Sequence, residues 1–184
     1  KQYGPEAMVE MMRKMGVGSY IDETYSLCVG SADLNVYEMV SAYNTFPSKG
    51  VFVEPIFVTR IEDSNGNVLG EFNNKKREAV SEYTAYLMAN LMQGVVNSGT
   101  GISLRATYGL TGEIAGKTGT TNDQSDGWFI GYTPSLTAGV WVGAEDRQVH
   151  FESLSLGGGS NMALPTWGIF MQKVIKDGTL GVTE

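Results

Sequence analysis

Three β-prone segments, at residues 114–121, 128–133 and 136–144, constrain the fold of this chain most strongly. Only the polar run 122–126 lies between the first two, and only Pro134-Ser135 lies between the last two. Links this short cannot hold a crossover helix, so neighbouring strands must run antiparallel. The sequence therefore predicts a three-stranded antiparallel meander.

Helical periodicity marks two segments in the N-terminal quarter. The first follows Gly4-Pro5 and ends at Gly16-Val17-Gly18. Its expected core face consists of Met8, Met11, Met12 and Met15. The second extends to Phe46, just before Pro47, with Asp33 or Asn35 as its N-cap. Its expected core face consists of Val36, Met39, Val40, Tyr43 and Phe46.

Two later segments have the same periodicity. A long helix is predicted after a cap at Ser81, ending in the small-residue run 97–101. Its expected core face consists of Thr84, Leu87, Met88, Leu91, Met92 and Val95. The region 146–159 is predicted to be a loop, and Pro165 opens a final helix that ends before Gly178. That helix is expected to pack through Trp167, Phe170, Met171, Val174 and Ile175.

Residues 51–72 change to β-type composition and contain Asn65-Gly66 between two β-prone runs. This dipeptide is the strongest local hairpin signal in the chain. The basic run 73–77 after it is predicted to be a solvated connector and not a nucleic-acid site. Helices, a hairpin, a meander and a final helix predict an α+β fold, with an antiparallel sheet packed against helices.

Composition excludes several kinds of function. The 184 residues carry a net charge of −7, from 13 basic and 20 acidic residues, which disfavours nucleic-acid binding. Cys28 is the only cysteine and His150 the only histidine, so no metal or cofactor site is predicted. Cys28 is expected to be a small buried apolar residue. No apolar run approaches the roughly 18 residues of a membrane span.

The run Lys117-Thr118-Gly119-Thr120 concentrates the groups that could bind an anion. Side chains alternate along a strand, so Lys117 and Gly119 should share one face, and Thr118 and Thr120 the other. Lys117 supplies positive charge, and Gly119 permits close approach of a ligand backbone. The N–H of Thr120 could stabilise a developing oxyanion. These features suit a strand that binds an extended peptide ending in a carboxylate.

The surroundings of this run resemble the third active-site segment of penicillin-binding proteins. The resemblance rests on residues 116–123, 126–134 and 139–143, and on the Lys-Thr-Gly element of that family. Residues 36–46, 55–72 and 95–101 also resemble the helix, hairpin and loop of class A, bifunctional members. The likeness covers nearly the whole chain. It implies the family's transpeptidase fold.

Two elements of that family are missing. No lysine has a serine three positions before it, and no serine is followed two positions later by asparagine. The nucleophile motif and the second motif are therefore absent, as is the glycosyltransferase half of class A proteins. We expect the chain to be the C-terminal part, residues 1–184, of one transpeptidase domain. Without the serine, it is expected to be inert and to form no covalent penicillin adduct.

The resemblance implies that the complete protein is a serine-type D,D-transpeptidase that cross-links peptidoglycan. Lys117 and Thr118 would be catalytic, and Gly119, Thr120 and Thr121 would bind substrate. It implies no cofactor and no metal. The implied partners are peptidoglycan stem peptides, β-lactams and the cell-wall synthesis machinery. The implied location is the outer face of the bacterial inner membrane, by an N-terminal anchor outside this chain.

The sequence leaves other interpretations open. The chain could be a noncatalytic module that captures a peptide or cell-wall component on the Lys117 strand, or a structural pseudoenzyme domain. Arg105 could contact an anionic substrate or an acid. Asp126 and Trp128 could border a cleft, but a turn acid and a sheet-packing aromatic are favoured. His150 is expected at the surface.

Overall fold

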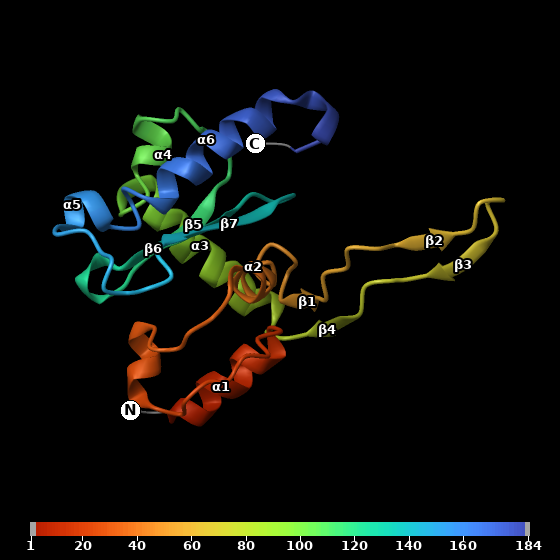
Figure 1. The fold of residues 1–184 in the computed structure, drawn as a ribbon, viewed down its shortest axis with the longest axis horizontal. Helices are drawn as coiled ribbons and strands as arrows, with labels where there is room; N and C mark the ends of the chain where they lie inside the picture. The colour runs from red at the N-terminus through yellow and green to blue at the C-terminus, as the bar shows by residue number, and fades with distance from the viewer. Residues whose placement is uncertain (1–2, 183–184) are drawn as a thin grey trace.

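The structure is a computed structural model, and it describes residues 3–182. It is an α+β fold in which helices cover an antiparallel sheet, as predicted (Figure 1). The α-helices are α1 (Pro5–Lys14), α2 (Val36–Tyr43), α3 (Glu82–Ser98), α4 (Ser103–Ala106), α5 (Leu154–Gly157) and α6 (Ala163–Lys176). Short 3-10 helices are η1 (Tyr25–Val29), η2 (Asn122–Gln124) and η3 (Gly178–Leu180).

The predicted meander is confirmed. Strands β5 (Ala115–Thr120), β6 (Asp126–Tyr132) and β7 (Thr137–Gly143) form one sheet in the order β5-β6-β7. Both pairings are antiparallel. The register sets Gly119 opposite Trp128, and Trp128 opposite Trp141. The short links therefore determined the topology.

Helices pack on both faces of this sheet. On one face, Phe129 of β6 meets Trp167 of α6 edge to face, with ring centroids 5.2 Å apart. Both side chains are fully buried in the largest core cluster. On the other face, a Cβ added at Gly139 of β7 would lie 2.5 Å from Val40 of α2. The sheet is thus held between α6 and α2, while α3 packs along β5 (Figure 1).

The buried face of α3 differs from the prediction. Ser81 caps the helix as expected, because its hydroxyl accepts from the amide of Thr84. The residues that face inward are Ala85, Met88, Ala89, Met92 and Val96. The predicted Leu87 and Leu91 are exposed, Leu91 by 69%. Small side chains on the inner face allow α3 to lie close to β5.

Two expectations for the N-terminal region are also wrong. In α1, Met15 is buried and Met8 and Met12 pack partly against the core, but Met11 is exposed. Val9 takes the buried position instead. Cys28, in η1, is exposed, and its thiol lies 3.5 Å from the sulfur of Met8. The core near η1 is closed by Leu27.

Helix α2 has polar groups on its buried side. Asn35 is the N-cap, since its side chain accepts from the amide of Glu38. Glu38 is itself buried. Its carboxylate accepts from the amides of Gly18 and Ser19, the Ser19 hydroxyl and the Asn35 side chain, at 2.7–2.8 Å. This carboxylate therefore ties the loop after α1 to the start of α2.

The hairpin prediction is confirmed, and its arms are longer than expected. Strands β2 (Arg60–Glu62) and β3 (Val68–Glu71) pair around the turn that holds Gly66, which has a φ of 84°. Their bases continue into a second pair, β1 (Val51–Val53) with β4 (Lys76–Glu78). The connector predicted at 73–77 is therefore partly a strand. The arm projects well beyond the body of the molecule (Figure 1).

Arg77 of β4 is a structural residue. Its guanidinium lies 4.3 Å from the ring centroid of Phe52 and donates to the carbonyl oxygens of Arg13 and Lys14. It thus binds the C-terminal end of α1, where a helix has unpaired carbonyl groups.

At the other end of the chain, Phe170 of α6 is exposed, contrary to expectation. The predicted loop 146–159 contains the short helix α5.

Candidate functional site

Strand β5 lies at the edge of its sheet, and no strand between residues 3 and 182 pairs with its outer side. The amide of Thr121 donates to the carbonyl oxygen of Asp126 at 3.2 Å. Hydrogen-bonded and non-hydrogen-bonded pairs alternate along an antiparallel ladder. Lys117 and Gly119 therefore direct their backbone groups at β6, whereas Thr118 and Thr120 direct theirs outward. This edge presents open backbone donors and acceptors.

The residues that pair with β5 on strand β6 confirm the predicted alternation of side chains along β5. Thr118 lies opposite Phe129, which packs against α6, so Thr118 and Thr120 lie on the α6 face. Lys117 lies opposite Ile130, which in turn lies opposite Gly139, so Lys117 is on the α2 face. Charge and hydroxyl groups thus occupy opposite faces of one edge strand.

Lys117 is exposed, and its ammonium bends around the open edge of the strand. The Nζ atom donates to the carbonyl oxygen of Thr118 over 2.8 Å. That carbonyl is one of the groups that point outward. The positive charge is therefore held where an extended ligand would pair with the strand.

The hydroxyl of Thr118 lies 2.7 Å from the hydroxyl of Thr100. Thr100 belongs to the loop between α3 and α4, which is tightly built: the amides of Gly99 and Gly101 both donate to the carbonyl oxygen of Val95. A Cβ at Gly99 would lie 2.9 Å from the Val95 backbone. Glycine is therefore required there, and the loop holds Thr100 against β5.

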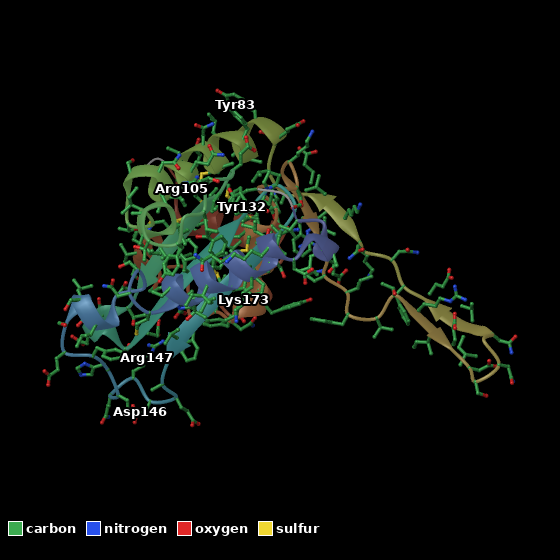
Figure 2. The ribbon with its side chains drawn as sticks, turned by 90° about the horizontal axis from the view of Figure 1, so that it is seen from above. Tyr83, Arg105, Tyr132, Asp146, Arg147 and Lys173 are labelled. Atoms are coloured by element: carbon green, nitrogen blue, oxygen red, sulfur yellow. The ribbon has the colours of Figure 1, made fainter. Side chains whose placement is uncertain are left out.

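Arg105 braces the same loop. Its guanidinium donates to the side-chain oxygen of Asn97 at 3.0 and 3.1 Å, and to the carbonyl oxygens of Leu110 and Gly112 at 2.7 and 2.8 Å. Figure 2 shows Arg105 beside α3. Its partners among the described residues are an amide side chain and two backbone carbonyls and not an acid, while contact with an anionic substrate stays a prediction. Arg105 joins the end of α3 to the segment that leads into β5.

Thr120 is exposed, and its hydroxyl oxygen accepts from the amide N–H of Gly159 at 2.9 Å. A Cβ at Gly159 would lie 2.1 Å from the carbonyl oxygen of Gly119 and 2.7 Å from that of Trp128. Only glycine lets the segment before α6 lie this close to β5 and β6. The segment supplies a hydrogen-bond donor to the site.

Gly119 and Thr121 have local partners. A Cβ at Gly119 would lie 3.1 Å from the Cβ of Trp128 on the adjacent strand. The Thr121 hydroxyl accepts from the amide of Asp126 and lies 2.9 Å from the Ser125 hydroxyl. Thr121 therefore closes the turn between β5 and β6. Their roles in substrate binding stay predictions.

The remaining candidates lie outside the edge of β5. Asp126 is buried at the start of β6, and its Oδ1 atom has no hydrogen-bond partner within the described residues. Trp128 is half-buried and faces Trp141 across the sheet. His150 is exposed, as expected, with its Nδ1 atom 3.2 Å from the carbonyl oxygen of Phe151.

Sequence reasoning missed two residues that contact the site, Thr100 and Gly159. The run 97–101 predicts a turn, within a segment that resembles a class A loop, and Gly157-Gly158-Gly159 lies in the predicted loop 146–159. The three consecutive glycines were the available signal for close backbone approach. Nothing local in the sequence indicated that a threonine in the first segment meets Thr118.

The rest of the described chain bears on three other kinds of functional feature: a metal site, a membrane-spanning helix and a cavity. No group of histidine, cysteine and acidic residues between positions 3 and 182 could hold a metal ion. In the same range, no helix has the length and hydrophobicity to cross a membrane. A hollow of about 330 Å³ lies between α2, the base of the hairpin and the β6–β7 turn. None of the predicted site residues lines it.

The sequence is similar to one protein family and to several curated proteins. The sequence matches the family model described as the penicillin binding protein transpeptidase domain, over residues 1–152. It is 33% identical to penicillin-binding protein 1A of Aquifex aeolicus, covering 94% of this chain and 23% of that protein. It is 32% identical to penicillin-binding protein 2D of Bacillus subtilis, covering 94% and 25%. The chain thus spans about a quarter of the length of these curated relatives.

Solved structures have the same fold. Penicillin-binding protein 1A from Haemophilus influenzae superposes with a TM-score of 0.83 at 21% identity, covering 95% of this chain and 31% of that one. The PonA1 protein from Mycobacterium tuberculosis, in complex with penicillin V, gives 0.77 at 24% identity, covering 94% and 50%. At these identities, the likeness concerns the fold.

Proposed function

The chain belongs to the penicillin-binding protein transpeptidase family, and from this premise we propose that the open edge of β5 is one wall of a transpeptidase cleft. The class A resemblance is confirmed, since relatives up to 38% identical are named penicillin-binding protein 1A. The observation that carries the proposal is the edge itself, which bears Lys117, outward backbone groups and two hydroxyls.

An extended peptide would pair with this edge by strand addition. The proposed ligand is the D-Ala-D-Ala end of a peptidoglycan stem peptide, or a β-lactam in its place. Its terminal carboxylate would accept hydrogen bonds from the hydroxyls of Thr118 and Thr120. Lys117 would assist proton transfer. The outward N–H of Thr120 would donate to the oxyanion, and Gly119 and Thr121 would shape the strand end.

The covalent step needs a serine that follows the family pattern, and no such serine occurs in the 184 residues. We therefore propose that the chain is the C-terminal part of a transpeptidase domain within a longer protein. There the serine oxygen would bond to the carbonyl carbon of the penultimate D-Ala, and the terminal D-Ala would leave with a proton. An amine of a neighbouring strand would then take the acyl group and restore the serine.

The longer protein would also carry the glycosyltransferase half of class A proteins. Its proposed place is the periplasmic face of the inner membrane, held by an N-terminal anchor. Its proposed partners are peptidoglycan and the machinery that synthesises it. No nucleic acid is expected, given the net charge of −7.

Labelling with a fluorescent penicillin tests the proposal. The full-length protein should form a covalent adduct, and peptide mapping should place it on a serine outside this chain. The 184-residue chain alone should form none by mass spectrometry. An adduct on the chain alone would contradict its proposed inertness. A full-length protein that binds stem peptides through Lys117 but never acylates would instead be a noncatalytic binding module.

A further inference from the structure

We infer that Thr100 is a positioning residue, which orients the hydroxyl of Thr118 so that its proton is free for the carboxylate of a ligand. This inference rests on the proposed function, because it concerns the same open edge. The two hydroxyl oxygens lie 2.7 Å apart, so one of the hydroxyls donates to the other. The direction of that bond decides what Thr118 can offer a ligand.

A hydroxyl has one proton to donate and two lone pairs to accept. If the Thr118 hydroxyl donates to Thr100, its only proton is engaged in that bond. The Thr118 oxygen then presents only lone pairs to an anion. If Thr100 donates to Thr118, the proton of Thr118 can point at the carboxylate. An anion at the edge therefore selects the second arrangement, with a relay from Thr100 through Thr118 to the ligand. Hydrogen bonds in such a chain strengthen one another.

The neighbouring hydroxyl is held in the same way. The amide N–H of Gly159 can only donate, and it is directed at the hydroxyl oxygen of Thr120. Thr120 therefore keeps its own proton for another acceptor. Thr118 and Thr120 lie two positions apart on the α6 face of β5, each with a donor behind it. Two protons are thus available on one side of the strand, which suits the two oxygens of a carboxylate.

The surrounding contacts give Thr100 the rigidity that this role requires. Its loop is closed by the amides of Gly99 and Gly101 on Val95. The Arg105 guanidinium fixes the two ends of the segment through Asn97 and the carbonyl groups of Leu110 and Gly112. Thr118 is thus oriented by a braced loop and not by a mobile side chain.

The variants Thr100→Val and Thr100→Ser in the full-length protein test the inference. Valine keeps the shape but removes the hydroxyl, and serine restores the hydroxyl. The measured quantity is the second-order rate constant of acylation by penicillin. Thr100→Val should lower it roughly fivefold to tenfold, in line with the loss of one hydrogen bond, and Thr100→Ser should restore it. The double variant with Thr118→Val should show no further loss beyond Thr118→Val alone.

A penicillin methyl ester separates positioning from a structural effect. The ester carries no negative charge and its carbonyl oxygen is a weaker acceptor than a carboxylate, so Thr100→Val should lose clearly less rate with the ester than with penicillin. An equal loss with penicillin and its ester, or a loss that serine fails to restore, would overturn the inference. So would an unchanged rate with penicillin. If the wild-type protein does not acylate at all, the proposed function itself fails, which is a different outcome.

Discussion

The amide of Gly159 donates to the hydroxyl oxygen of Thr120 at 2.9 Å, although the two residues are 39 positions apart. The contact is possible only because Gly159 has no side chain, since a Cβ would lie 2.1 Å from the carbonyl oxygen of Gly119. One glycine thus joins the segment before α6 to the candidate binding edge.

Gly159→Ala is therefore expected to destabilise the protein. The added methyl group would meet two backbone carbonyls that cannot turn away, and overpacking of this kind costs about 1–3 kcal/mol. Chemical unfolding followed by tryptophan fluorescence would measure the loss. Gly178→Ala is the matched control, since a Cβ there has no neighbour within 4 Å. Equal stability of the two variants would contradict the packing described for Gly159.

Lys117→Met should abolish most acylation in the full-length protein without affecting its folding. The side chain is exposed, so its removal should leave the unfolding temperature unchanged. Proton transfer assisted by a positioned group contributes roughly 10²–10⁴-fold to rate, and the acylation rate should fall by that order. Lys176→Met, on the exposed side of α6, is the control. A variant at Lys117 that acylates at the wild-type rate would remove the residue from the proposed site.

Glu38→Gln should destabilise the protein by about 1–3 kcal/mol near neutral pH, because an amide cannot accept all four hydrogen bonds of the buried carboxylate. Burial raises the pKa of Glu38, but hydrogen bonds from the Ser19 hydroxyl and nearby amides outweigh it and hold the pKa below its usual value. The exposed Glu152→Gln is the control.

The same variant has a defined pH dependence. A carboxyl whose pKa is lowered on folding stabilises the protein above its unfolded pKa of about 4.3, and this stability is lost as the pH falls through the folded pKa. The difference in unfolding free energy between wild type and Glu38→Gln should therefore be largest at neutral pH. It should shrink below about pH 4.3. A difference that grows in acid would contradict the hydrogen-bonding pattern of Glu38.

Arg105→Met should cost about 2–3 kcal/mol of stability, because it leaves carbonyl groups of Leu110 and Gly112 and the Asn97 side chain without their donor. Arg147→Met is a matched control on an exposed loop (Figure 2), where the arginine pairs with Asp33. Exposed ion pairs contribute little. Similar unfolding midpoints for the two variants would show that Arg105 does not brace the loop.

Local signals in the sequence predicted local structure well. The caps at Asn35 and Ser81 and the turn at Asn65-Gly66 each depend on neighbours a few positions away, and each is confirmed. The short links of the meander also left only one arrangement of its strands. In these places, the interacting residues are only a few positions apart in the sequence, so the sequence alone identifies both partners.

Burial depended on partners that periodicity does not identify. On α3, hydrophobicity favoured Leu87 and Leu91 inside, but close packing on β5 selected Ala85 and Ala89. Cys28 was expected in the core and is exposed. Thr100 and Gly159 reach β5 only through the tertiary fold, so no window of sequence around Lys117 contains them. The Lys-Thr-Gly motif could be identified from the sequence, but the hydrogen-bond partners of the Thr118 and Thr120 hydroxyls could not.

The open edge of β5 also bears on how the chain behaves in solution. An unpaired strand edge is a template for any extended chain, including an identical one, and such pairing leads to aggregation. Lys117 lies in the middle of this edge and is exposed. Two copies that paired there antiparallel, in a register centred near Lys117, would bring their ammonium groups together, which is unfavourable. The positive charge of Lys117 thus discourages self-association along this edge, whereas it would not repel the anionic peptide proposed as the ligand.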